Sequence, residues 1–225
     1  MWVKVCANTS LEDALLAAEA GADAVGFVFA ESVRRVTVGQ VAAITPHLPA
    51  NVEKIGVFVD ADFDALAAAI EACGLTGVQL HSGGEADITA RLREHYSRER
   101  LRILKVIHFQ QGLEAELRAA GADGSIDGVL VDSRTATLLG GTGTQFDWQT
   151  ARGSFAGARL RLVAAGGLNP ANVGEAIATL QPWGVDVASG VEASPGKKDA
   201  AKVRAFVENA RLAAHKLKRI AAIKV

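Results

Sequence analysis

Short apolar runs alternate along the whole chain with segments in which apolar residues recur every three or four positions. The apolar runs are typical of buried strands, and the segments between them have the period of amphipathic helices. The expected strands are 3–6, 24–29, 55–60, 77–81, 103–109, 128–133, 160–165 and 184–188. About eight strand–helix units at short, regular spacing indicate parallel strands joined by helical crossovers.

Six helices follow from the same periodicity. They are expected at 11–22, 38–47, 62–74, 85–95, 113–120 and 199–215. A closed α/β barrel, the (β/α)8 TIM barrel, fits this count better than an open doubly wound sheet. The first expected strand lacks a following Gly-x-Gly-x-x-Gly, and GTGTQ at 141–145 has no third glycine. We therefore predict one barrel domain over 1–225, with 216–225 as a basic tail that frays.

The composition supports a large core and a small-molecule ligand. The 225 residues are 49% hydrophobic and include 23 glycines, and the formal net charge is −1. This charge gives no electrostatic basis for nucleic acid as a partner. The two cysteines, Cys6 and Cys73, lack the spacing of a zinc site or a disulfide framework. With no leader sequence and no apolar run long enough to span a membrane, we expect a soluble, cytoplasmic protein.

The stretch from 160 to 198 contains one plan twice: an apolar run, a turn with glycine, and a segment expected to be helical. Gly166–Gly167 forms the first turn, and Asn169–Pro170 supplies an N-cap and a proline at the first helical position. Ser189–Gly190 opens the second segment. Free backbone N–H groups from two such loops can converge on one anion. In (β/α)8 barrels the loops after the last two strands often bind phosphate, and these loops have that position.

Catalytic residues of a (β/α)8 barrel come from the carboxyl ends of the strands, which makes Cys6 a candidate. Cys6 ends the first expected strand and shares a face with Lys4 by the alternation of strand residues. The cysteine is either a small buried hydrophobe or a functional thiol. A lysine inside the barrel needs a carboxylate partner, for which Asp60, Asp132 and Asp186 are the candidates.

Other reactive side chains at these strand ends keep two interpretations each. Asp132 and Asp60 follow apolar runs, so each is either a cap for the next turn or a catalytic carboxylate. His81 and His108 are acids, ligands or hydrogen-bonded structural residues, and no His, Asp or Glu cluster has metal-ligand spacing. Arg34, in the loop 32–37, binds an anionic substrate group or is solvated.

Taken together, these stretches resemble one family, phosphoribosylanthranilate isomerase of tryptophan biosynthesis, along nearly the whole chain. The matching stretches, in order, are VKVC, LEDALLAAEAGADAVGFVF, SVRRVT, GVFVD, GVQLH, LVDS, GGTGTQFDW, GGLNPANV and VDVASGVEASPGKKD. The resemblance implies an intramolecular oxidoreductase, an aldose–ketose isomerase that rearranges N-(5-phosphoribosyl)anthranilate to 1-(2-carboxyphenylamino)-1-deoxyribulose 5-phosphate. It implies no cofactor and no metal. We expect the chain to form a monomer or a homodimer, which the sequence does not decide.

The resemblance also implies roles for individual residues. The family's general base corresponds to Cys6 and its general acid to Asp132. Its arginine for the anthranilate carboxylate corresponds to Arg34, and its aspartate near the anthranilate amine to Asp186. The phosphate contacts correspond to Gly143, Gly166, Gly167, Ser189 and Gly190. Because a base must be a thiolate, we expect cationic or N–H neighbours to lower the pKa of Cys6.

The chain departs from the family pattern around the mouth of the barrel. Ala7-Asn8 stands where the family usually has Gly-Ile, so a Cβ at position 7 restricts the backbone or crowds the substrate, and Asn8 makes the loop more polar. Arg35 replaces a common aromatic, and Thr144 a usual lysine. Two alternatives follow: a related sugar-phosphate isomerase that accepts another amine, and an idle phosphate-binding barrel, against which the intact Cys6 and Asp132 argue.

Overall fold

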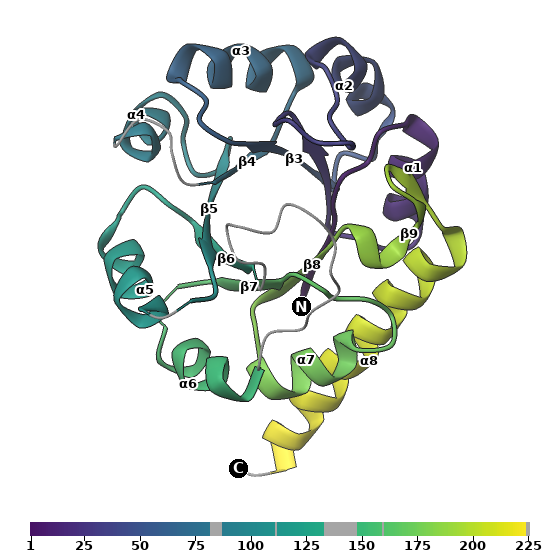
Figure 1. Cartoon of the computed structure of the whole chain (residues 1–225), viewed down its shortest axis with the longest axis vertical. Helices are drawn as coiled ribbons and strands as arrows, with labels where there is room; N and C mark the ends of the chain where they lie inside the picture. Colours follow the sequence, from purple (N-terminus) through teal and green to yellow (C-terminus); the bar gives the residue numbers. More distant parts are fainter. Residues whose placement is uncertain (82–86, 111, 133–147, 159, 224–225) are drawn as a thin grey trace.

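Eight parallel strands close into a barrel in the computed structural model, which describes residues 1–81, 87–110, 112–132, 148–158 and 160–223 (Figure 1). Each strand pairs with its neighbours in sequence, and β1 pairs with β8 to close the ring. The strands are β1 (Trp2–Val5), β2 (Ala24–Val28), β3 (Glu53–Phe58), β4 (Gly77–Leu80), β5 (Arg102–His108), β6 (Gly128–Asp132), β7 (Leu162–Ala165) and β8 (Gly184–Val187). The predicted (β/α)8 barrel is confirmed.

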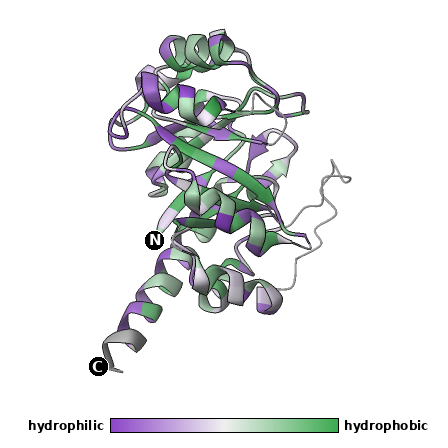
Figure 2. Cartoon of the chain, turned by 90° about the vertical axis from the view of Figure 1, so that its left-hand side faces the viewer, coloured by the Kyte–Doolittle hydropathy of each residue, from purple (hydrophilic) through white to green (hydrophobic). Residues whose placement is uncertain are grey.

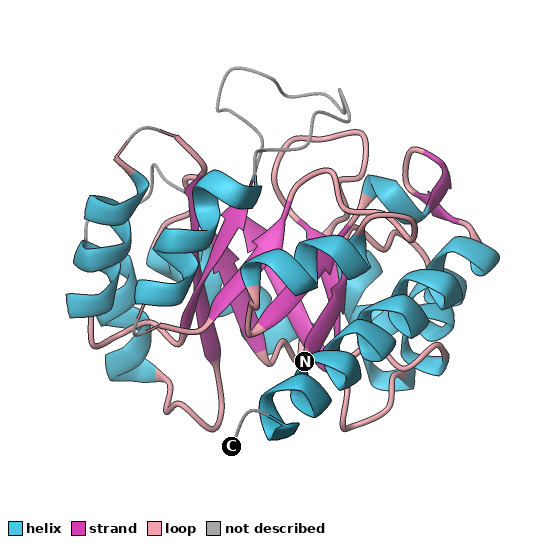
Figure 3. Ribbon diagram, turned by 90° about the horizontal axis from the view of Figure 1, so that it is seen from below, coloured by secondary structure: helices cyan, strands magenta, loops and turns pink. Residues whose placement is uncertain are grey.

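Helices surround the barrel and cover the outer faces of the strands. They are α1 (Leu11–Glu19), α2 (Val38–Ile44), α3 (Phe63–Cys73), α4 (Ile88–His95), α5 (Leu113–Ala122), α6 (Trp148–Gly157), α7 (Val173–Leu180) and α8 (Ala200–Ile223). Short 3₁₀ turns, η1 (Thr45–His47) and η2 (Ser189–Val191), follow α2 and β8. After η2 the chain forms a small antiparallel hairpin of β9 (Glu192–Ser194) and β10 (Lys197–Lys198), seen at the carboxyl edge of the barrel in Figure 3.

The helices differ from the sequence prediction most clearly in three cases. α7 begins at Val173 rather than at Pro170, because the Asn169 side chain accepts from the Ala171 N–H at 2.8 Å and closes a separate turn first. α6 was not predicted, since its two glycines and its Thr and Ser residues weaken the helical signal. α8 continues past His215 to Ile223, so most of the basic segment 216–225 belongs to this helix.

The barrel interior is apolar at the amino ends of the strands and polar at the carboxyl ends. Its lower layers are filled by Trp2, Ala24, Ile55, Leu104, Leu130 and Val163, and Val106 and Ala165 belong to the same apolar cluster. Strand residues show mostly hydrophobic colours in Figure 2, consistent with burial on both faces of a parallel sheet. Above these layers lie buried polar side chains, of which Lys4, Gln79, Asp132 and Asp186 are at most 9% exposed. A buried polar group needs a specific partner, so this layer is the place to look for chemistry.

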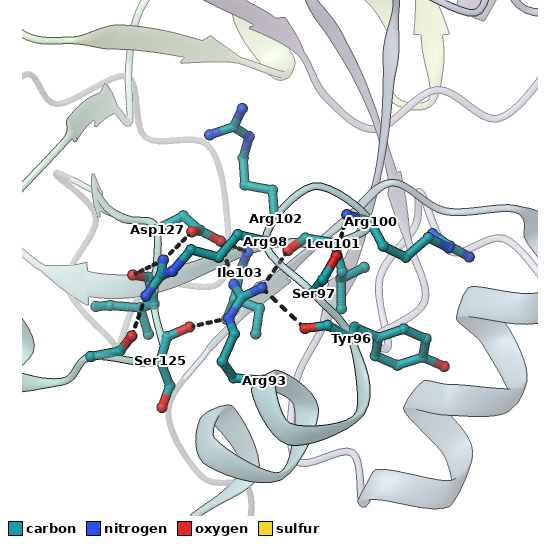
Figure 4. Close-up of polar contacts among 12 residues, drawn as sticks. Arg93, Tyr96, Ser97, Arg98, Arg100, Leu101, Arg102, Ile103, Ser125 and Asp127 are labelled. Atoms are coloured by element: carbon teal, nitrogen blue, oxygen red, sulfur yellow. Dashed lines mark hydrogen bonds and ion pairs between the residues drawn. The ribbon is translucent and has the colours of Figure 1, made fainter.

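A polar network around Asp127 lies at the opposite end of the barrel, before β5 and β6 (Figure 4). The Asp127 carboxylate accepts from Arg93 Nη2 at 2.6 Å and from the Ile103 backbone N–H at 2.7 Å, and Arg98 also pairs with it. The Arg93 guanidinium further bonds the carbonyls of Leu101 and Ser125. These contacts tie the chain before β5 to the chain before β6. Within the described residues, no helix combines the length and apolar character that crossing a bilayer requires.

Candidate active site

Cys6 and Lys4 lie inside the barrel, as strand alternation predicted. Lys4 is fully buried and Cys6 is 5% exposed. Cys6 directly follows β1, and its backbone N–H donates to the Val187 carbonyl at 2.7 Å, which extends the pairing with β8 by one residue. Both side chains pass over Gly26 of β2: an added Cβ there would lie 2.6 Å from Cys6 Sγ and 2.9 Å from Lys4 Cε. The thiol and the lysine stem therefore share one confined space.

Asp186 is the carboxylate partner of the buried lysine. Lys4 Nζ donates to Asp186 Oδ1 and to Gln79 Oε1, each at 2.8 Å. Burial alone would lower the pKa of Lys4, but the charges and hydrogen bonds of Asp186 and Cys6 together outweigh it and raise that pKa. Lys4 is thus a cation at neutral pH. Asp60, another of the three candidates, is exposed after β3, so it does not serve this lysine.

The expected lowering of the Cys6 pKa is wrong for the free protein. Burial raises the pKa of the thiol, and this effect exceeds the opposing influence of Lys4 and Lys198. The negative charge of Asp186 adds to the increase. The sequence reveals a nearby lysine, but it does not reveal how completely the thiol is removed from water. The thiol is therefore the main form before a ligand binds.

Asp132 ends β6 and is 3% exposed. It alternates with Leu130, a residue of the barrel interior, so its side chain belongs to the same face. Its register partner on β5 is His108, and the ring of His108 lies 6.1 Å, centroid to centroid, from that of His81 after β4. β1 and β6 are separated around the barrel by β7 and β8 on the shorter side. Cys6 and Asp132 therefore lie at the carboxyl ends of two strands, β1 and β6, that are not neighbours in the barrel.

Arg34 is held in a bidentate ion pair with Glu192 of β9. Arg34 Nε donates to Glu192 Oε1 at 2.8 Å, and Nη2 donates to Oε2 at 2.7 Å. Lys198 of β10, whose side chain is fully buried, places Nζ 3.4 Å from Glu192 Oε1. Burial would raise the pKa of Glu192, but the hydrogen bonds from Arg34 and the charge of Lys198 outweigh it and lower that pKa. Burial lowers the pKa of Lys198 despite Glu192 and Cys6.

Sequence reasoning did not identify Glu192 or Lys198. The hairpin brings them beside the loops after β1 and β2, where Thr9 Oγ1 donates to the Gly196 carbonyl at 2.6 Å. A signal existed in the segment VEASPGKK, where a single glutamate and paired lysines flank a proline-glycine turn. That segment was expected to be helical, and a helix would not have brought both side chains under Arg34.

The loops after β7 and β8, which the sequence predicts to bind phosphate, are in contact with each other. Gly166 and Gly167 have φ of 82° and 65°, in the left-handed region that glycine tolerates. A Cβ on Gly190 would lie 1.9 Å from the carbonyl oxygen of Leu168, so only glycine fits this contact between the two loops. Ser189 is exposed beside it. Gly143 lies outside the described residues.

The two departures after Cys6 have different consequences. Ala7 has φ of 62° and is 1% exposed, so a residue with a Cβ occupies a left-handed conformation here. Asn8 does not line the mouth as a polar residue: it is fully buried, and its Nδ2 donates to the carbonyls of Val5 at 2.8 Å and Gly26 at 3.2 Å. The expected change in loop polarity is therefore wrong, whereas the backbone restriction at position 7 is present.

A cavity of about 350 Å³ lies away from these residues, between α5 and α6. It is lined by Phe109, Gln110, Gly112, Leu113, Glu114, Ala115, Arg118, Thr150 and Ser154. None of the predicted site residues is among them. The convergence of charged and nucleophilic groups at the barrel mouth, rather than this hollow, marks the candidate active site.

Comparison with known proteins gives a consistent result. A family model described as N-(5'phosphoribosyl)anthranilate (PRA) isomerase matches residues 3–209. A protein of Geobacter sp. (strain M21) named N-(5'-phosphoribosyl)anthranilate isomerase is 44% identical over 210 residues, which are 93% of this chain and 97% of the relative. The crystal structure of phosphoribosyl anthranilate isomerase from Thermotoga maritima has a TM-score of 0.81 at 37% identity, covering 94% of this chain and 98% of that one. Another solved phosphoribosyl anthranilate isomerase, in complex with reduced 1-(o-carboxyphenylamino)-1-deoxyribulose 5-phosphate, has a TM-score of 0.78 at 35% identity, with coverage of 94% and 98%.

Proposed function

The chain belongs to the N-(5'-phosphoribosyl)anthranilate isomerase family, and from this we propose that Cys6 and Asp132 are the base and the acid of its reaction. The protein is an isomerase of tryptophan biosynthesis and acts on N-(5'-phosphoribosyl)anthranilate. The observation that carries the assignment of roles is the mouth of the barrel. There a buried thiol and a buried carboxyl group project into one interior from β1 and β6.

The reaction needs one group that gives a proton and one that takes a proton. Asp132 in its protonated form donates to the furanose ring oxygen, so the bond from that oxygen to C1′ breaks and an iminium forms. The Cys6 thiolate then takes the proton from C2′, which gives an enolamine. The enolamine tautomerises to the ketone with no net change in protons. Each transfer contributes to the rate as general acid–base catalysis.

Lys4 supports the base in this scheme. Its ammonium group is paired with Asp186 and shares the space over Gly26 with the thiol. A cation beside a thiol favours the thiolate, which is the form that accepts a proton. The iminium formed by ring opening adds a second positive charge near the thiol. Both effects act against the burial that raises the pKa of Cys6 in the free protein.

Five further groups are proposed to bind the substrate. Arg34 binds the anthranilate carboxylate, since a guanidinium matches a carboxylate in geometry and charge. Asp186 accepts from the anthranilate amine while its Oδ1 remains bonded to Lys4. The backbone N–H groups of the Gly166–Gly167 and Ser189–Gly190 turns hold the phosphate, and we propose that Gly143 contributes to the same site. Inorganic phosphate should therefore compete with the substrate.

Binding of the reduced product, the ligand of the solved relative, tests these assignments. We expect Arg34→Met and Asp186→Asn each to weaken it about 10-fold in a fluorescence titration, because each removes a hydrogen bond that involves a charged group. Inorganic phosphate should displace the ligand from both variants as it does from the wild type. Unchanged affinity in both variants would show that the ligand binds elsewhere.

Three statements from the sequence stay predictions. The cytoplasmic location can be checked by cell fractionation. The oligomeric state, monomer or homodimer, can be checked by sedimentation equilibrium. The absence of a cofactor and a metal can be checked by measuring turnover after dialysis against a chelator.

A further inference from the structure

Glu192 contacts Arg34 along one edge of the guanidinium group. It uses Nε at 2.8 Å and Nη2 at 2.7 Å, and both bonds have the length of charge-assisted hydrogen bonds. The opposite edge, formed by Nη1 and the second hydrogen of Nη2, is not the edge that Glu192 binds. A planar guanidinium can bind a different carboxylate on each edge. Glu192 itself therefore engages a single edge of the guanidinium group, through Nε and Nη2.

Glu192 is itself held in a fixed position. Its side chain is 4% exposed, and its Oε1 also accepts from the Gly196 N–H at 3.3 Å and from Lys198 Nζ at 3.4 Å. Lys198 is anchored as well, since its Nζ donates to the Ala188 carbonyl at 3.3 Å and its backbone N–H donates to Asp13 Oδ2 at 3.2 Å. A glutamate with this many partners cannot follow a mobile arginine. The arginine must instead adopt the position that the glutamate dictates.

The charges of the three residues favour an incoming anion. Arg34 and Lys198 are cationic groups and Glu192 is an anionic group, so with Lys198 protonated the three side chains together carry one net positive charge. Lys198 thereby offsets the repulsion that Glu192 would otherwise exert on a second carboxylate. Without Lys198, the ion pair between Arg34 and Glu192 would be neutral and would attract the substrate carboxylate weakly.

We propose that Glu192 is a positioning residue for the isomerase reaction: it orients Arg34 in advance for the carboxylate of the substrate, with Lys198 balancing its charge. The inference rests on the proposed role of Arg34. A free arginine side chain must lose rotational freedom when it binds a ligand, and a preformed bidentate pair removes most of that loss. Glu192 therefore strengthens binding of the carboxylate without touching the substrate.

The experiment compares two ligands in fluorescence titrations: the reduced product, and the same molecule without its carboxylate. Glu192→Gln should bind the reduced product about 10-fold more weakly, since Gln keeps the shape but cannot hold the guanidinium by charge. The ligand without the carboxylate should bind within about 2-fold of the wild type. Arg34→Met should show the same selectivity, and Arg34→Met with Glu192→Gln should lose no more than Arg34→Met alone.

Glu53→Gln is the matched control. Glu53 makes the same kind of bidentate pair, with Arg102 at 2.8 Å on both bonds, at the amino ends of β3 and β5. The Glu53→Gln variant should bind both ligands with the same affinity as the wild type. Glu192→Asp, which keeps the charge but shortens the side chain, should give an intermediate loss for the reduced product. This variant keeps the test decisive if Glu192→Gln folds poorly.

The remaining outcomes overturn the inference in distinguishable ways. If Arg34→Met discriminates between the ligands and the Glu192 variants do not, only the positioning role is wrong. Equal weakening of both ligands by the Glu192 variants would mean a general structural role. Tighter binding of the reduced product would mean that Glu192 competes with the substrate for Arg34. If Arg34→Met binds both ligands like the wild type, the carboxylate role of Arg34 fails, and the inference fails with it.

Discussion

Lys4 Nζ lies 2.8 Å from Asp186 Oδ1, in an ion pair that crosses from β1 to β8 inside the barrel. The two residues are direct partners in the strand register and are separated by 182 positions in the sequence. This ion pair fixes the positions of Lys4 and Asp186 next to Cys6. One buried contact thus links the charge next to the proposed base with a proposed substrate-binding carboxylate.

Removing the Lys4 charge should change the pH dependence of catalysis in a defined way. The active form, with Cys6 as thiolate and Asp132 protonated, has the same number of protons as the thiol–carboxylate form. For this reason kcat/KM should be level near neutral pH and fall as the pH rises through the pKa of Cys6. In Lys4→Met, the fall of kcat/KM at alkaline pH should begin about 1 pH unit or more higher than in the wild type. The value of kcat/KM near neutral pH should decrease by the factor that corresponds to this pKa shift.

The matching shifts separate an electrostatic role of Lys4 from a structural one. Structural damage alone would lower kcat/KM near neutral pH without shifting the pH at which it falls. That result would contradict an electrostatic role of Lys4. Lys105→Met, on the exposed side of β5, is the control and should change neither. The profile is measured as initial rates from pH 6 to 10.5, with circular dichroism confirming the fold of each variant.

Ala7→Gly should stabilise the protein. Ala7 has φ of 62°, where a Cβ costs roughly 1–2 kcal/mol. Glycine removes this cost but loses more conformational entropy on folding, so we expect a net gain of about 0.5–1 kcal/mol in the free energy of unfolding. Urea denaturation monitored by circular dichroism measures the difference. A loss of stability would mean that the Ala7 methyl group contributes more by packing than its backbone strain costs.

Gly190→Ala should impair binding of the phosphate group. The added Cβ would lie 1.9 Å from the Leu168 carbonyl oxygen, so the loops after β7 and β8 must move apart. With charge-assisted hydrogen bonds to the phosphate lost, we expect about 10- to 100-fold weaker inhibition by inorganic phosphate. Gly174→Ala in α7, where a Cβ meets no atom within 4 Å, is the control and should bind phosphate normally. Equal inhibition of both variants would place the phosphate elsewhere.

Asp127→Ala should reduce stability but not catalysis. The change leaves the Ile103 N–H and the Arg93 guanidinium without their carboxylate, at the end of the barrel away from the mouth. We expect a loss of about 2–3 kcal/mol in the free energy of unfolding, with kcat within about 2-fold of the wild type. Glu114→Ala, which breaks an exposed pair with Arg118, should change the stability little. A large fall in kcat in a fully folded Asp127→Ala variant would contradict the view that stability depends on one end of the barrel and catalysis on the other.

The fold could be predicted because it depends on local patterns. Each strand is an apolar run and most helices show their period, so the order of elements specifies a parallel barrel. α6 was missed because Gly153 and Gly157 give its segment the composition of a loop. The proline-glycine turn at 195–196 indicated a break, but the hairpin around it depends on contacts with Thr9 that no local pattern contains.

The site was predictable as far as single residues and their strand ends allow. Cys6 and Lys4 could be placed on one face of the first strand by alternation, whereas the sequence left Asp132 as either a turn cap or a catalytic carboxylate. The choice of Asp186 over Asp60 required the register of β1 with β8, which is set by closure of the barrel. The direction of the Cys6 pKa was wrong because desolvation depends on the whole surrounding structure rather than on one neighbouring lysine.

Turnover of N-(5'-phosphoribosyl)anthranilate, followed by the loss of its fluorescence, tests the central claim most directly. We compare the wild type with Cys6→Ser and Asp132→Val, all with confirmed folds and with measured affinity for the reduced product. The account predicts that kcat falls by at least about 10²-fold in each variant while that affinity stays within about 10-fold, since each removes one proton-transfer group. Turnover near the wild-type rate in either variant would contradict the assignment of Cys6 as the base or Asp132 as the acid.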